Sequence, residues 1–223
     1  FKEMDKKKLT LKMQIRQEYY RVKELLDGKR PSRMDLFTYM DDEIYRICVS
    51  GSHAKENPFQ HYLDFLYELD ELSEDEQELY AGIGREFIQT IETTEMQKVY
   101  KMPILYSFYN HGNIRLAVTD EEVLESWKEF FDTGTNWKDF PNVNTYEEYK
   151  KVTDKQHLSK AKRMPIRYLK ASGKVFFVEK DGYALALRDE IGDVVGNMAF
   201  GEQMGDVLGY RSLEYYRRRY EKK

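Results

Sequence analysis

The sequence predicts a mainly α-helical fold with a small β component. Across most of its 223 residues, apolar side chains recur at three- and four-residue steps, which is the pattern of helices with one buried face. Four segments begin with Ser or Thr followed three residues later by an acid, an arrangement that caps a helix start. The clearest strand pattern lies near 174–188, where two β-rich runs flank Asp181-Gly182. These observations favour a helical array with a β-hairpin towards its C-terminal end.

The chain is long enough for two smaller domains. We expect residues 1–95 to form a helical subdomain and residues 96–223 a mixed subdomain that contains the hairpin. Hydrophobic residues make up 41% of the chain and charged residues 34%, which is the composition of a folded protein.

Several features bear on the compartment. No apolar run approaches the roughly 20 residues that span a membrane, and no signal-peptide pattern opens the chain. The single cysteine, Cys48, excludes an intrachain disulfide and fits a reducing environment. We therefore expect a cytoplasmic protein that does not bind membranes. Because Phe1 is not an initiator methionine, we also expect the chain to be part of a longer protein.

The first two helices and the turn between them are the strongest functional lead. Apolar residues from Leu11 to Leu26 predict one helix, and Gly28 followed by Pro31 predicts its end. Ser32 and Asp35 resemble a capping box that opens a second helix through Cys48. The turn between them is expected to present Lys29, Arg30 and Arg33 outward. This helix-turn-helix-like hairpin with a basic turn could contact phosphate.

The remaining elements follow from caps and spacing. Helices are expected to begin near Asn57-Pro58 and Pro103, and also at the boxes of Ser73, Thr119 and Thr145. Alternating apolar residues at 114–118 predict a short strand. The hairpin is expected to turn tightly at its central Asp-Gly. A last helix is expected near 213–220.

Charge is distributed unevenly along the chain. Residues 1–33 and 151–223 each carry a net charge of +6, whereas residues 34–98 carry −12. One interpretation is that these are ordinary solvated faces that partly pair in the fold. The other is that the basic ends converge on a phosphate backbone.

The sequence contains no recognisable catalytic motif. It lacks a nucleotide-binding glycine loop, and its four histidines have no partner at a zinc-ligand spacing. Glu148-Tyr149-Lys150 has an acid–x–lysine spacing found in nucleases, but it follows a helix cap and so is expected on a helix. We expect neither a cofactor nor a metal in this chain, and nuclease activity is the weakest of the functional hypotheses.

The chain resembles the region that follows the motor in some bacterial superfamily II (DEAD/DEAH-box) helicases, including enzymes of restriction or defence type. The likeness covers most of the chain and rests on Glu18-Tyr19-Tyr20, Lys23, Leu25, Gly28, Arg30-Pro31-Ser32, Asp35-Leu36, Lys101-Met102-Pro103, Phe108-Tyr109-Asn110, Gly112-Asn113, Trp127 to Phe131, the hairpin, and Arg211 to Arg219. The resemblance implies a non-motor accessory region that contacts nucleic acid or a partner subunit. The family's ATP-binding loop and Asp-Glu box match no position here, so no ATPase activity is expected.

Three functional hypotheses follow. The first is an accessory nucleic-acid-binding region of an ATP-dependent helicase, with DNA a better candidate than RNA. Its phosphate contacts would be Lys29, Arg30, Ser32, Arg33, Lys160, Lys162, Arg163, Arg217, Arg218 and Arg219. The second is a docking or scaffold module whose acidic middle binds the helicase motor or another protein subunit. The third is a degenerate nuclease.

Overall fold

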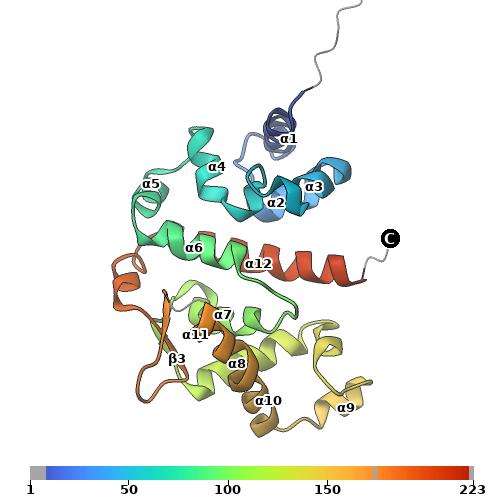
Figure 1. Cartoon of the computed structure of the whole chain (residues 1–223), viewed down its shortest axis with the longest axis vertical. Helices are drawn as coiled ribbons and strands as arrows, with labels where there is room; N and C mark the ends of the chain where they lie inside the picture. The colour runs from blue at the N-terminus through green and yellow to red at the C-terminus, as the bar shows by residue number, and fades with distance from the viewer. Residues whose placement is uncertain (1–8, 173–174, 221–223) are drawn as a thin grey trace, which may run out of the picture. The chain divides into compact units, whose positions relative to one another are not determined.

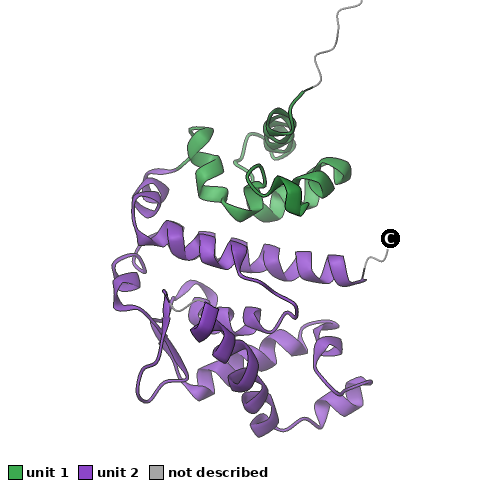
Figure 2. Cartoon of the chain, in the orientation of Figure 1, with its two compact units in different colours: residues 1–72 green, residues 73–223 purple. Residues whose placement is uncertain are grey.

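A computed structural model of the chain describes residues 9–172 and 175–220. The chain divides into two compact units, Phe1–Leu72 and Ser73–Lys223, coloured separately in Figure 2. We had expected the boundary near residue 95. It lies earlier because α5 (Glu74–Ala81) and α6 (Ile83–Thr93) pack on α12 (Met198–Tyr220), the long helix that ends the chain.

The prediction of a mainly helical fold with a small β component is confirmed. Figure 1 labels most of the elements. Unit 1 contains α1 (Leu11–Leu25), α2 (Arg33–Tyr39), α3 (Asp42–Cys48) and α4 (Tyr62–Glu68). In addition to α5, α6 and α12, unit 2 contains α7 (Lys101–Tyr109), α8 (Asp120–Asp132), α9 (Tyr146–Lys150), α10 (Asp154–Ala161), α11 (Arg167–Ser172), β1 (Ala117–Val118), β2 (Phe177–Val178) and β3 (Leu185–Leu187).

Unit 1 begins with the predicted helix, turn and helix. Gly28 has a φ of +82°, and Ser32 and Asp35 form a complete capping box at the start of α2. The prediction of one long second helix is wrong, because the chain breaks at Met40 and restarts with Asp41 as the cap of α3. Glu18 of α1 holds this break, since its carboxylate accepts the N–H of Asp41 at 2.9 Å.

Unit 2 is built around α12. This helix packs against α5, α6 and α7, and α7 in turn packs against α8. The aromatic rings of Phe87, Phe177 and Phe200 form part of the core between α6, the sheet and α12. The sequence predicts only the last third of α12. Its first half contains Gly201, Gly205 and Gly209, and glycine weakens a helix locally.

The small sheet has the order β1-β3-β2, with both pairs antiparallel. The hairpin of β2 and β3 is therefore confirmed, although Lys174, where it was expected to begin, lies outside the described residues. The expected two-residue turn is wrong, because Val178 pairs with Ala186 and leaves a wider loop. The N–H of Ala184 donates to the carbonyl of Val118 in β1, so it does not bond to the opposite side of that loop. Gly182, with a φ of +82°, forms a local turn within the loop.

Candidate functional site

The basic turn of unit 1 differs from the outward-facing turn that we expected. Arg33 is 0% exposed, and its guanidinium lies 4.7 Å from the centre of the Tyr62 ring. The hydroxyl of Tyr62 donates a hydrogen bond to the carbonyl of Pro31 and so fixes the turn from α4. The expectation that Arg33 faces solvent is therefore wrong. An arginine can be buried where an aromatic ring covers its planar face.

The other predicted residues of the turn are also largely engaged. Arg30 is half-buried and donates to the backbone carbonyl of Glu71 at 3.0 Å. The hydroxyl of Ser32 caps α2 by accepting the N–H of Asp35 at 3.1 Å. Lys29 is exposed. The turn thus presents fewer accessible cations than its sequence suggests.

The C-terminal arginines lie in the last turns of α12. Arg219 places its Nε 2.6 Å from Oδ1 of Asp139, whose side chain is fully buried. Burial raises the pKa of Asp139, while the charges of Arg219 and Lys98 oppose that rise. Arg218 pairs with Glu214 one turn earlier at 3.2 Å, and Arg217 is half-buried. Arg219 and Arg218 therefore already have carboxylate partners.

A different arrangement exists around α10, whose sequence explains its shape. Thr153 and Gln156 form a capping box at its start. The helix continues into a π-helical segment, Lys162–Ile166, that contains Pro165. Proline has no N–H to bond the carbonyl four residues earlier, and a wider π turn relieves the clash. The same helical run then continues as α11.

A groove of about 580 Å³ lies along this run, between the loop that precedes α9, α9 and α10. We call it the basic groove and define it by its four cations, Lys151, Lys155, Lys160 and Arg163. Apolar and uncharged side chains, among them Phe140, Pro141, Val152 and Ser159, form the rest of its lining, with Glu148 as its acid. Two of the phosphate contacts predicted from the sequence, Lys160 and Arg163, therefore lie in this groove.

The cations of the basic groove form no ion pairs, although Lys160 donates to the sulfur of Met164 at 3.1 Å. Within residues 9–172 and 175–220, none of the four lies within 4.0 Å of a carboxylate oxygen. Their neighbours in sequence behave differently. Lys162 pairs with Asp120 at 2.8 Å and Lys170 with Glu179 at 2.6 Å. Lys162, which we had predicted to bind phosphate, is therefore an ion-pair partner of α8.

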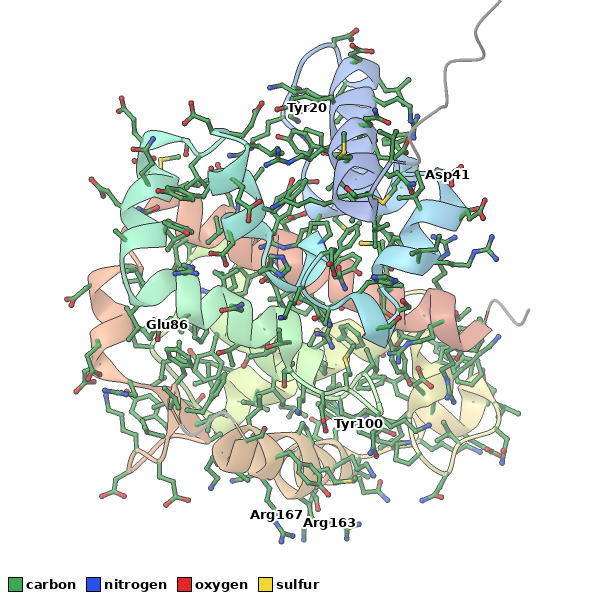
Figure 3. The ribbon with its side chains drawn as sticks, turned by 45° about the horizontal axis from the view of Figure 1, so that its top comes forward. Tyr20, Asp41, Glu86, Tyr100, Arg163 and Arg167 are labelled. Carbon is green, nitrogen blue, oxygen red and sulfur yellow. The ribbon has the colours of Figure 1, made fainter. Side chains whose placement is uncertain are left out.

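Arg167 follows on the same helical run outside the groove, is exposed, and likewise forms no ion pair in the described part of the chain. In an α-helix, positions four apart drift by about 40° around the axis. The π-helical segment has more residues per turn, which reduces this angular difference between Arg163 and Arg167. Figure 3 shows Arg163 and Arg167 pointing outward on the same side of the ribbon.

The electrostatics of the groove reflect this clustering. Burial lowers the pKa of Lys160, and the charges of Arg163 and Lys98 lower it further. The ammonium of Lys160 lies 5.3 Å from the centre of the Tyr100 ring, and the hydroxyl of Tyr100 donates to the backbone carbonyl of Asp139 at 2.7 Å. Like charges without carboxylate partners repel one another, and a bound polyanion relieves that repulsion.

Three cations of this surface were missed by the sequence analysis. Lys151, Lys155 and Arg167 lie outside the densest Lys/Arg clusters. A local signal exists for Arg167, which follows Arg163 by four residues. On a helix, that spacing places side chains on one face.

The acidic middle, which supports the docking hypothesis, is partly neutralised within unit 1. Glu68 pairs with Lys12 at 2.7 Å, and Glu71 pairs with Lys23 at 2.7 Å. Glu74, Asp75 and Glu78 of unit 2 are exposed on α5. The acidic residues are therefore divided between the units, and two of them have cationic partners.

The residues considered for nuclease chemistry lie on a helix, as predicted. Glu148 and Lys150 belong to α9, and Lys150 pairs with Glu147 at 2.8 Å. Among the described residues, no group of three or more His, Cys, Asp or Glu side chains is placed to hold a metal ion. None of the helices in that part of the chain has the length and apolar character needed to cross a membrane.

Comparison with known proteins gave no relatives. No protein-family model matches the chain. Neither the curated proteins nor the solved structures contain a significant match. The function must therefore be inferred from the chemistry of the surfaces described above.

Proposed function

We propose that the chain binds the phosphate backbone of nucleic acid through the basic groove of unit 2. The observation that carries this proposal is the set of four unpaired cations, Lys151, Lys155, Lys160 and Arg163, in one groove with a single acid. Lys and Arg side chains that neutralise phosphates release condensed counterions, and this release is a main source of affinity for nucleic acid. Paired cations such as Lys162 contribute less, because binding must first break an existing ion pair.

The dimensions of the helical run suit a nucleic-acid backbone. Lys155 and Arg167 are twelve residues apart, or about 18 Å at the helical rise per residue. One strand of a duplex has a phosphate every 3.4 Å or so along the axis, so this length faces roughly five phosphates. A groove that contacts phosphates alone fixes the position of a strand without reading its sequence. We therefore expect binding without strong base preference.

In this proposal the chain is an accessory region of a larger ATP-dependent helicase. The resemblance described above motivates that role, and the absence of an ATP-binding loop in the sequence fits a region outside the motor. The region would hold the nucleic acid while the motor moves along it. DNA is the first substrate to test.

The test compares two double variants of the full chain that lose the same charge. Lys155→Ala/Arg163→Ala removes two unpaired cations, whereas Lys162→Ala/Lys170→Ala removes two cations that have carboxylate partners. Fluorescence anisotropy at low salt would measure binding to labelled duplex DNA, single-stranded DNA and RNA. We expect the groove variant to bind duplex DNA roughly tenfold more weakly than the unmodified chain, and the control to stay within about threefold.

Two outcomes would contradict the proposal. One is equal weakening by both variants, which would mean that only net charge matters. The other is that the unmodified chain does not bind any of the three nucleic acids at low salt. Thermal unfolding of each variant checks that a loss of binding does not come from a loss of folded protein.

A further inference from the structure

A second cavity lies elsewhere in unit 2 and has a different chemical character. It has a volume of about 490 Å³, which is within the usual range for small-molecule sites. Its walls come from α7, the turn that follows it, α8 and α12. None of the four cations of the basic groove lines it.

The walls of this cavity are aromatic. Tyr106, Tyr109, Phe130 and Tyr216 all line it, and the rings of Tyr106 and Phe130 are 6.1 Å apart. Gly209 of α12, which has no side chain, also lines the cavity. One turn earlier, Gly205 approaches α7 so closely that a Cβ there would lie 2.5 Å from the Tyr109 hydroxyl.

Two residues of the same walls carry buried hydroxyl groups. The hydroxyl of Tyr216 is buried and has no hydrogen-bond partner in the described part of the chain. The hydroxyl of Ser212 is likewise buried and has no hydrogen-bond partner in that part of the chain.

The charge at this cavity is negative. Of the three acids that line it, Glu122 is paired with Arg115 at 3.1 Å. Glu125 is exposed and forms no ion pair within the described residues. Glu129 is 3.5 Å from His111, which compensates its charge only when the imidazole is protonated. Two carboxylates, one helical turn apart on α8, are therefore left to attract a cation.

We propose that this cavity binds a small organic cation, an ammonium group carried on an apolar body. Carboxylates at the rim attract the positive charge, and the faces of tyrosine and phenylalanine rings stabilise a cation that leaves water. The apolar body fills the space between α8 and α12. The same carboxylates repel phosphate, so this site is distinct from the basic groove and does not depend on nucleic-acid binding.

Three probes of matched shape test the charge requirement. Phenethylamine is a cation at neutral pH, phenethyl alcohol is neutral, and hydrocinnamate is an anion. Titration of the isotopically labelled full chain, followed by amide NMR, would locate and measure binding. We expect phenethylamine to shift the amides of Glu125 to Thr133 and of Gly209, and to bind several-fold more tightly than the alcohol. Hydrocinnamate is expected to bind most weakly.

Variants of α8 separate charge from shape. Glu125→Gln/Glu129→Gln should weaken phenethylamine binding roughly three- to tenfold and leave phenethyl alcohol unchanged, because each exposed ion pair contributes modestly. Glu121→Gln removes an exposed acid of the same helix that does not line the cavity, and it should leave both affinities within about twofold.

Two further observations would overturn this inference. The first is that charge does not matter: phenethyl alcohol or hydrocinnamate binds as tightly as phenethylamine, or Glu125→Gln/Glu129→Gln does not weaken the binding of phenethylamine. The second is that these amides do not shift at roughly 10 mM probe, a concentration that would occupy even a millimolar site.

Discussion

The basic turn of unit 1 and the basic groove of unit 2 carry similar numbers of cations but differ in what those cations already contact. In the turn, Arg33 is buried against Tyr62 and Arg30 bonds a carbonyl. In the groove, Lys155 and Arg163 have no carboxylate partner in the described part of the chain. A cation therefore signals a binding site by its availability, and the local density of Lys and Arg is a poor guide to it.

The largest effect that we expect is a loss of folding stability when a buried cation of the basic turn is replaced. Replacing Arg33 with Ala removes a fully buried side chain and leaves a cavity beside Tyr62, so we expect a loss on the order of 3 kcal/mol in the free energy of unfolding. Lys155→Ala, an exposed groove variant, should change it by less than about 0.5 kcal/mol. Urea unfolding of the full chain measures both. Equal losses would remove the distinction between a structural and an available cation.

For nucleic-acid binding, reversing a charge in the groove should have a larger effect than reversing a charge in the turn. Arg163→Glu replaces a groove cation with a carboxylate that repels phosphate, and we expect it to weaken duplex binding by roughly tenfold or more at low salt. Lys29→Glu reverses an exposed charge in the turn, and we expect a change of no more than about threefold. Anisotropy titrations at one salt concentration compare the two. A larger effect of Lys29→Glu would move the proposed interface to the turn.

A smaller effect should appear as pH dependence beside the groove. His157 of α10 is buried against the rings of Phe140 and Tyr149, and burial lowers its pKa, with a further contribution from Lys128. The carboxylates of Asp132 and Asp154 oppose this shift. The unfolded chain therefore binds a proton more readily than the folded chain does. The stability due to neutral His157 is present above its ordinary pKa of about 6.5 and is lost as the pH falls below that value.

His157→Gln should reduce this dependence. Thermal unfolding between pH 5 and 7.5 should show that the variant loses less stability on acidification than the unmodified chain, with a difference of at most about 1.4 kcal/mol per pH unit. His61 of unit 1, whose pKa burial also lowers, acts in the same direction in both proteins and so cancels in the comparison. If the stability of the variant and of the unmodified chain depended on pH in the same way, the proposed contribution of neutral His157 would be contradicted.

Local signals allowed much of the fold to be predicted. The capping boxes at Ser32, Ser73 and Thr119 were read directly from the sequence, because each is made by residues three apart. The break at Met40 was not predicted, since it involves a hydrogen bond from the backbone N–H of Asp41 to Glu18 of another helix. The first half of α12 was missed for a related reason, because its glycines weaken the helix locally but allow close packing on Tyr109.

The candidate site was only partly predictable for the same physical reason. Lys160 and Arg163 were found by charge density. Lys162 and Arg219 were selected by the same criterion, but their partners, Asp120 and Asp139, are distant in sequence. Long-range ion pairs of this kind leave no local pattern. Arg167 could have been found from its four-residue spacing to Arg163 once the helix was recognised.

The salt dependence of duplex binding tests the central claim most directly. Each phosphate contact contributes about 0.9 to the slope of log affinity against log salt concentration. Lys155→Ala/Arg163→Ala should therefore reduce the slope by roughly 2, whereas Lys162→Ala/Lys170→Ala should reduce it by less than about 0.5. Parallel lines for the unmodified chain and the groove variant would show that the unpaired cations do not contact phosphate, and would contradict the proposed interface.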